Sequence, residues 1–153
     1  MKRHGILFAI IALAASNFAL AGGPPDMVMG AARFDSFDSK VEIMAKSDAD
    51  GANATGRFRL RQANIDLDIE GEVTCLSVNG NWSAAAGTIV KSNEIGLLGL
   101  AFLQLTRDNG EGWDDSDQSQ TAIFDFDPAT CADFVGFDPD FAVDRGNYEV
   151  KDR

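Results

Sequence analysis

Apolar and polar residues alternate along most of the chain after Met27, and turn residues separate the alternating segments. In segment 40–47, for example, Val41, Ile43 and Ala45 fall on one face and charged residues on the other. A period of two is typical of β-strands that bury one face, and no long helical period follows the N-terminus. The pattern therefore predicts an all-β protein, a single antiparallel sandwich or small closed barrel of about eight strands.

The segments 57–61 and 65–70 are predicted to form a hairpin whose outer faces carry opposite charge. Pairing them around a short loop sets Arg61 opposite Asp66, Arg59 opposite Asp68, and Arg57 opposite Glu70. The arginine row has two interpretations, a basic binding stripe or one half of a cross-strand ladder of ion pairs. The ladder is favoured because it explains the row without any partner.

A second hairpin is predicted over 72–90, where Asn79-Gly80 stands between two apolar runs. Asn-Gly is a strong signal for a two-residue hairpin turn, because both central positions of that turn need positive φ. This turn would pair Val78 with Asn81 and place Cys75 opposite Ala84.

The segment 97–103 is apolar on both predicted faces, unlike the other strands. A strand of this kind is buried on two sides or lies under another segment. Its outer residues, Leu98, Leu100 and Phe102, are expected to be covered by the chain's own loops or by a second copy. A homo-oligomer formed through residues 97–103 is one partner that this pattern allows.

Residues 1–21 are predicted to be a signal peptide and residues 22–153 a single secreted domain. Lys2, Arg3 and His4 precede a short apolar run, and Ala19-Leu20-Ala21 provides a cleavage site with small residues. The apolar run is shorter than the roughly 20 residues that span a bilayer. The expected location is secreted or periplasmic, without membrane insertion after cleavage.

Charge and histidine content narrow the possible functions. The full chain has a net charge of −11, and removal of Lys2 and Arg3 with the signal brings it to −13. A chain this acidic is not expected to bind nucleic acid, which requires a basic face. The only histidine, His4, would leave with the signal, so His-based nucleophilic sites and His-ligated metals are not expected. No catalytic residue, cofactor site or metal site is predicted.

Cys75 and Cys131 are the only cysteines and would both meet an oxidising compartment. They are predicted to form one structural disulfide that anchors segment 72–78 to the segment after Pro128. Closing a loop of this length stabilises a fold by roughly 4 kcal/mol.

The segment 107–117 carries five acids, which raises the question of a calcium site. Counted from Asp108, positions three and five of an EF-hand loop would be Gly110 and Gly112, and position six would be Trp113. This segment therefore fails the EF-hand pattern and is predicted to be a structural hairpin loop. A weak calcium site of the extracellular kind remains the alternative.

The C-terminal two-thirds of the mature chain contains several short motifs that together make up one pattern. They read G-x-V-x-C-L-x-V-x-G-N-x-A, then D-N-G-E-G, a second cysteine, and G-N-x-x-V-x-D. The matching positions here are Gly71, Val73, Cys75, Leu76, Val78, Gly80, Asn81 and Ala84, then Asp108–Gly112, Cys131, and Gly146, Asn147, Val150 and Asp152. In this pattern the chain resembles an uncharacterised family of small secreted bacterial β-domains, and Trp82 departs from it. The resemblance implies a secreted β-domain with one disulfide, and no activity.

Two classes of function are consistent with these features. The first is a non-catalytic binding, surface or structural module whose ligand would be a protein or a glycan. The second is a carboxylate-based hydrolase acting on glycans, which needs two acids about 5–9 Å apart in a cleft, one with a raised pKa. A deep pocket holding a desolvated acidic pair would favour the hydrolase, whereas scattered surface acids would favour the module.

Overall fold

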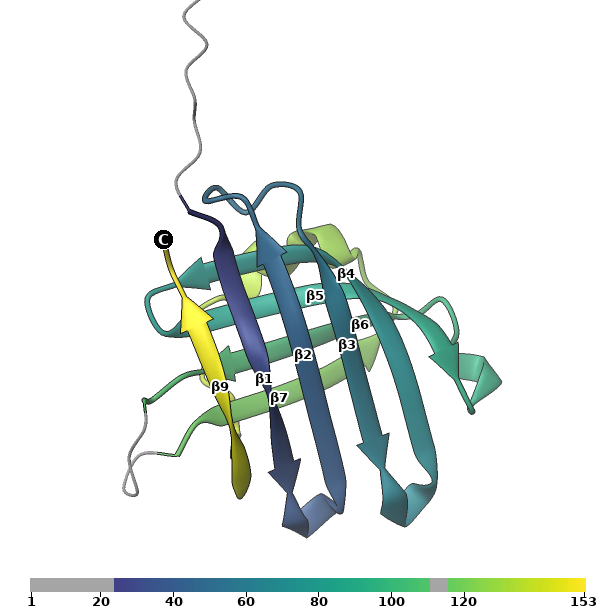
Figure 1. The fold of residues 1–153 in the computed structure, drawn as a ribbon. Helices are drawn as coiled ribbons and strands as arrows, with labels where there is room; N and C mark the ends of the chain where they lie inside the picture. The colour runs from purple at the N-terminus through teal and green to yellow at the C-terminus, as the bar shows by residue number, and fades with distance from the viewer. Residues whose placement is uncertain (1–23, 111–115) are drawn as a thin grey trace, which may run out of the picture.

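The computed structural model describes residues 24–110 and 116–153, which form one nine-stranded antiparallel sheet curled into an open half-barrel (Figure 1). The strands are β1 (Asp26–Phe34), β2 (Ser39–Ser47), β3 (Thr55–Gln62), β4 (Leu67–Asn79), β5 (Trp82–Ser92), β6 (Ala101–Arg107), β7 (Gln118–Phe124), β8 (Phe141–Ala142) and β9 (Arg145–Lys151). Short 3-10 helices are η1 (Asp35–Phe37), η2 (Ala63–Ile65), η3 (Ile95–Leu97) and η4 (Pro128–Phe134). The all-β prediction is confirmed, but the sandwich or closed barrel of about eight strands is wrong.

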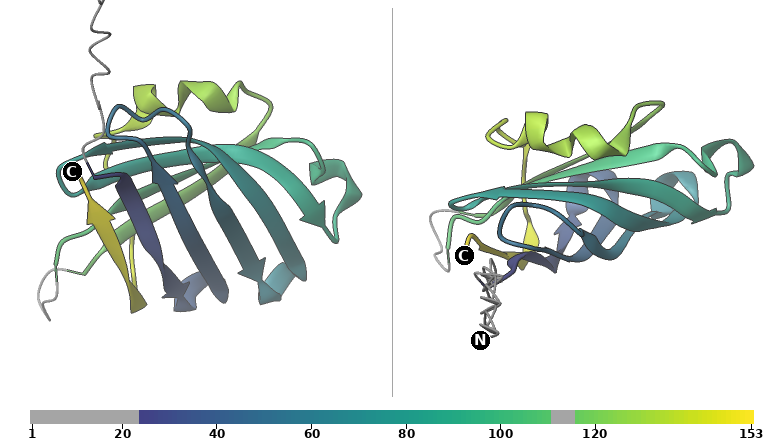
Figure 2. Two further views of the ribbon diagram at one scale, coloured as in Figure 1. Left: turned by 45° about the horizontal axis from the view of Figure 1, so that its top comes forward. Right: turned by 90° about the horizontal axis from the view of Figure 1, so that it is seen from above.

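The sheet curls because β4 bends where it crosses from one half of the sheet to the other. Its pairing with β5 shifts register between Glu70 and Gly71 and again between Val73 and Cys75. Such bulges bend a strand and increase its twist. As a result, β1, β2, β3 and β9 run crosswise over β5, β6 and β7, with the core between the two groups (Figures 1 and 2).

The interior core joins the two halves through aromatic packing. Phe58 and Phe102 are fully buried and stack with ring centroids 4.3 Å apart. Gly71 makes this possible, because a Cβ at that position would lie 2.4 Å from the Phe102 ring. The residues that alternate along β2, Val41, Ile43 and Ala45, lie in this core, as predicted.

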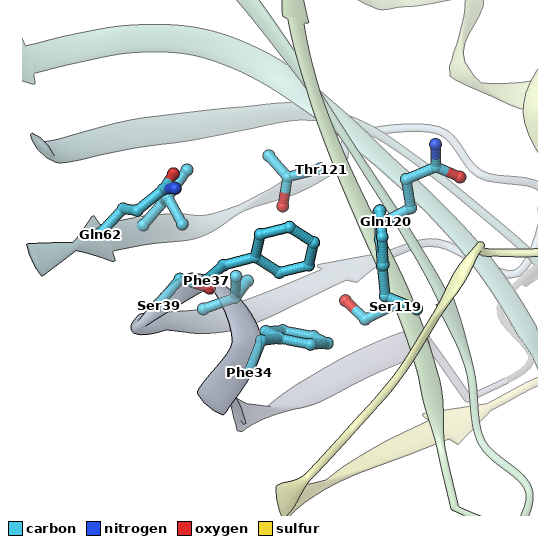
Figure 3. A pocket seen from close by; sticks show the side chains of 10 residues that line it. Phe34, Phe37, Ser39, Gln62, Ser119, Gln120 and Thr121 are labelled. Carbon is cyan, nitrogen blue, oxygen red and sulfur yellow. The ribbon is translucent and has the colours of Figure 1, made fainter. Parts of the chain in front are cut away.

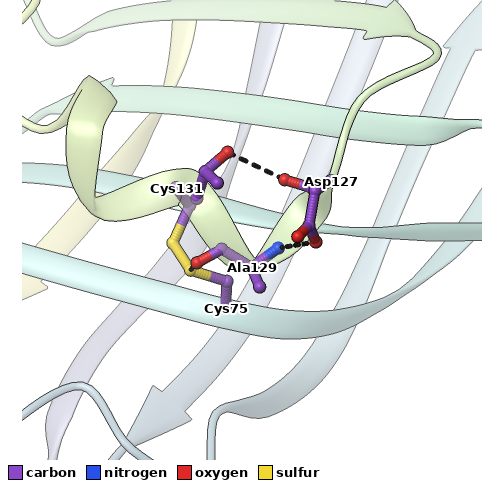
Figure 4. The surroundings of a disulfide bond; sticks show 5 residues. Cys75, Asp127, Ala129 and Cys131 are labelled. Atoms are coloured by element: carbon purple, nitrogen blue, oxygen red, sulfur yellow. Dashed lines mark hydrogen bonds between the residues drawn. A yellow bond between two sulfur atoms is a disulfide. The ribbon is translucent and has the colours of Figure 1, made fainter.

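A second, smaller core lies on the outer face of β4 to β6, where η4 packs (Figures 2 and 4). The predicted disulfide is present, with the Cys75 and Cys131 Cα atoms 5.9 Å apart, and it ties η4 to β4. Asp127 caps η4 by accepting the backbone N–H of Ala129 at 2.9 Å. This segment explains why Leu103 and Leu105, on the outer face of β6, are buried.

The prediction for segment 97–103 is only partly correct. The strand begins at Ala101, and Phe102 faces the interior instead of the outside. The outer residues that the chain's own segment covers are Leu103 and Leu105, under η4. Leu98 precedes the strand and is 45% exposed, so it is not covered within the described part of the chain.

Both predicted hairpins form, with registers displaced by two residues. Arg61 lies opposite Asp68 and Arg59 opposite Glu70, because η2 and a left-handed Asp66 (φ 53°) lengthen the turn. The charge ladder itself is present, with Arg59 2.8 Å from Asp68 and 3.5 Å from Glu70. An even displacement keeps every side chain on its predicted face.

In the second hairpin the turn residues are Gly80 and Asn81, not Asn79 and Gly80. Only Gly80 has positive φ (60°), which corresponds to a type II′ turn with glycine at the first central position. Asn79 therefore pairs with Trp82, and Cys75 lies opposite Ala86. The Trp82 ring packs under the Arg107 guanidinium, 4.6 Å from the ring centroid.

The strand β9 lies at one edge of the sheet, and it is joined to the ends of β6 and β7 by side chains instead of a backbone ladder. The backbone N–H of Tyr148 donates to Asp117 Oδ2 (2.7 Å), and that of Val150 donates to Asp108 Oδ2 (3.0 Å). These bonds satisfy the edge of β9, so no β7–β9 ladder forms among the described strands. This is why the expected closed barrel is an open half-barrel.

Among the helical segments of residues 24–110 and 116–153, none has the length and apolar character needed to cross a bilayer. The predicted signal peptide, residues 1–21, lies outside the described residues.

Candidate functional site

A pocket of about 150 Å³ opens at the end of the half-barrel where β1, β3 and the β1–β2 turn meet β7 (Figure 3). One wall comes from β1 to β3 and their turns, namely Phe34, Phe37, Ser39, Val41, Leu60 and Gln62. The other wall comes from β7 and β8, namely Ser119, Gln120, Thr121 and Phe141. We call this site the mouth pocket.

Aromatic side chains line the open side of the mouth pocket. Phe37 in η1 and Phe141 in β8 contact each other edge to face, with ring centroids 5.0 Å apart. They are 37% and 40% exposed, whereas Phe34 behind them is 6% exposed. The pocket thus passes from half-exposed rings at its rim to buried apolar side chains inside.

A buried polar network forms the β7 wall. The Gln104 side chain donates to Ser119 Oγ (2.6 Å) and accepts from Thr121 Oγ1 (2.6 Å). Ser119 Oγ also lies 3.2 Å from the Tyr148 hydroxyl. Alternation along β6 and β7 explains the grouping, since these side chains fall on the interior face of neighbouring strands.

Counting donors in this network leaves one hydroxyl proton unused. Ser119 and Tyr148 hold two hydroxyl protons but share one hydrogen bond, and Ser119 already accepts from Gln104. Burial raises the pKa of Tyr148, so its hydroxyl stays protonated. Either hydroxyl can donate in the pair that Tyr148 forms with Ser119. Ser119 lines the mouth pocket, so its hydroxyl is placed to meet a polar group of a ligand there.

The lining contains no charged side chain among the residues described. Its polar groups are the hydroxyls of Ser39, Ser119 and Thr121 and the amides of Gln62 and Gln120. Such a lining favours an uncharged group, since a buried charge without a partner is costly. An ionised ligand group has no counter-charge inside this pocket.

The described ends of the acidic segment, residues 107–110 and 116–117, lie outside the mouth pocket, and two of their aspartates hold β9. Asp117 is 4% exposed, and its two oxygens accept the backbone N–H groups of Tyr148 and Asn109. Burial raises the pKa of Asp117, although these amide bonds oppose the shift. Asp108 accepts from Val150 and Gly110, so the described ends of the segment have structural roles.

The remaining acids of this segment, Glu111, Asp114 and Asp115, lie outside the described residues. Within the described ranges, no group of three or more Cys, Asp or Glu side chains is placed to hold a metal ion. Asp108 and Asp117 do not line the mouth pocket, and both are occupied by backbone amides. They therefore do not form the acidic pair in a cleft that the hydrolase alternative requires.

Sequence reasoning did not identify the mouth pocket. Its two walls are separated by more than fifty residues, between Gln62 and Ser119, and the chain between them gives no sign that they meet. Segment 118–124 is uncharged, but so are segments 73–90 and 95–106, so the absence of charge does not single it out.

No family model, no curated protein and no solved structure matches the chain.

Proposed function

We propose that the protein is a non-catalytic binding module of the extracytoplasmic space, and that the mouth pocket takes one uncharged, ring-sized group. The observation that carries the proposal is a pocket with three phenylalanine rings, no charged lining residue, and the Ser119 hydroxyl in its wall. The disulfide is compatible with an extracytoplasmic location. Membership of the small secreted bacterial β-domain family stays a prediction.

The size and chemistry of the pocket favour a phenol over a sugar. A cavity of about 150 Å³ in which five of the ten lining residues are apolar has room for a benzene-sized ring. A phenol places its ring against Phe34 and Phe37 and offers its oxygen to Ser119. A sugar ring would carry several hydroxyl groups into a lining that is half apolar, and each one left without a partner would cost free energy.

Calorimetric titration with p-cresol tests the proposal, with glucose as the glycan comparison. The expected dissociation constant for p-cresol is about 0.1–1 mM, in line with its few non-hydrogen atoms. Val41→Phe places a larger side chain in the pocket and should weaken binding at least about tenfold. Val90→Phe is the matched control, because Val90 lies on the outer face and is 44% exposed.

Unchanged p-cresol affinity in Val41→Phe, or equal loss in both variants, would contradict the assignment of the pocket. Tighter binding of glucose than of p-cresol would contradict the assignment of the ligand class.

A further inference from the structure

The two edges of the sheet differ in whether their outward backbone groups have hydrogen-bond partners. At β9, Asp117 and Asp108 accept the outward N–H groups of Tyr148 and Val150. At the other edge, β8 pairs with only two residues of β7, Gln118 and Ser119. Beyond Ser119, β7 has no partner on this side among the described residues.

The backbone groups that face this open edge can be identified from the ladder. The Val143 N–H donates to the Asp117 carbonyl at 2.8 Å, so Asp117 presents its backbone groups to the β8 side. These directions alternate along a strand, and the β6–β7 register is continuous from Arg107–Gln118 to Ala101–Phe124. Thr121 and Ile123 therefore direct their N–H and C=O groups to the open edge.

The open edge lacks the features that usually protect such strands. Proteins guard exposed edges with charged residues, prolines or bulges. Residues 120–124 (Gln-Thr-Ala-Ile-Phe) contain no charge and no proline, and their pairing with β6 has no bulge. An unprotected edge of this kind is a template for another strand.

The open edge and the mouth pocket belong to one site. Ser119 and Thr121 line the pocket from the interior face of β7, and Ile123 packs against the interior core from the same face. A strand added beside β7 would direct every second side chain to that face. One such side chain would enter the mouth pocket beside Phe141, which β8 already places there.

We propose that the partner is an extended peptide segment of another protein that adds to β7 as a strand and inserts one tyrosine-like side chain into the mouth pocket. This inference rests on the proposed function of the pocket. The charges at the two ends of the open edge indicate which residues of the peptide flank its tyrosine-like side chain. Asp125 follows β7 at one end of the edge, and Asp140 precedes β8 at the other. Both are exposed, and neither forms an ion pair within the described residues, so basic residues at the two ends of the peptide complement the site.

The test uses the peptide Lys-Thr-Val-Tyr-Val-Thr-Lys with blocked ends, titrated by calorimetry into the protein. Two further versions of the peptide carry N-methyl groups on the backbone of alternate residues. One version blocks the N–H groups of one edge of the extended peptide, and the other version blocks those of the opposite edge. Only one peptide edge can pair with β7, so one version should bind about tenfold more weakly and the other like the parent. Replacing the peptide's tyrosine by alanine should weaken binding by a similar factor.

A protein variant tests the edge independently. Ile123→Pro removes an N–H that faces the open edge and leaves the β6–β7 bonds in place, since proline is tolerated on such an edge. It should lose peptide affinity about tenfold relative to Ile123→Val. Retained p-cresol binding in Ile123→Pro would show that the pocket is still formed.

The outcomes separate the two proposals. Equal affinities for both methylated versions and the parent, with p-cresol still bound, would overturn the strand addition and leave the pocket assignment standing. Binding of neither p-cresol nor peptide would overturn the proposed function and this inference with it. A concentration-dependent dimer that Ile123→Pro abolishes would overturn the peptide partner in favour of a second copy.

Discussion

At the scale of single residues, Asp117 illustrates how one carboxylate replaces a stretch of backbone pairing. It accepts the N–H groups of Tyr148 (2.7 Å) and Asn109 (3.0 Å), and its own carbonyl accepts from Val143 (2.8 Å). Residues from three separate segments therefore meet at this position. The two amide bonds give hydrogen-bond partners to both oxygens of a buried side chain.

Asp117→Ala should lower the free energy of unfolding by about 3 kcal/mol, because two buried or part-buried donors lose their acceptor. Urea denaturation measures the change. Asp140→Ala is the control, since Asp140 is exposed and forms no hydrogen bond or ion pair among the described residues. Equal stability of the two variants would show that the contact between β9 and the start of β7 does not depend on Asp117.

The raised pKa of Asp117 predicts a particular pH dependence. Burial makes the folded state hold this proton more tightly than the unfolded chain, whose carboxyl pKa is about 3.9. The contribution of the group to stability is therefore greatest in acid and falls as pH rises through the raised pKa. Relative to Asp117→Asn, the wild type should lose stability on going from about pH 4 upward across this window. A wild type that gains stability relative to Asp117→Asn as pH rises would contradict the burial of this carboxylate.

At the scale of elements, strand identity and facing were predictable, whereas register was not. A period of two assigns faces from local sequence, so residues such as Ile43 and Leu60 are inside as expected. Register depends on turn geometry, and the left-handed Asp66 and the type II′ turn at Gly80 each displaced a hairpin by two residues. The half-barrel and the mouth pocket depend on Asp108 and Asp117 meeting β9, more than thirty residues along the chain.

The disulfide and η4 form one element with β4 to β6. The double variant Cys75→Ala/Cys131→Ala should lose about 4 kcal/mol of unfolding free energy, because the unfolded chain regains the entropy of a 56-residue separation. Urea denaturation of the oxidised wild type and the double variant gives the value. Asp127→Ala, which removes only the cap of η4, should cost about 1 kcal/mol. A double variant no less stable than Asp127→Ala would contradict the anchoring role.

The two sheet edges should also differ in hydrogen exchange. The amides of Thr121 and Ile123 face an open edge and should exchange rapidly, whereas those of Tyr148 and Val150 donate to aspartates and should be protected. Amide exchange followed by NMR measures all four in one protein. Protection of Thr121 and Ile123 in the isolated monomer would mean that another segment already covers β7.

At the scale of the whole molecule, the proposed binding site shares Phe34, Val41 and Leu60 with the interior core and lies apart from the disulfide-linked η4. The interior core and the disulfide-linked η4 hold the two halves of the sheet together, and the aspartates fasten β9 to the ends of β6 and β7. Beyond the residues that pair with β8 the edge of β7 stays open in the described part of the chain, and uncharged side chains line a small pocket beside it. A half-barrel open at one end is suited to holding a ligand group at its mouth.

The central claim, that this mouth is the binding site, is tested most directly by an NMR titration of the protein with p-cresol. The account predicts saturable shifts of the backbone amides of Ser39, Gln62, Ser119 and Thr121, and none at Val90 on the outer face. Saturable shifts confined to the outer face or to η4, or no shifts at p-cresol concentrations well above about 1 mM, would contradict it.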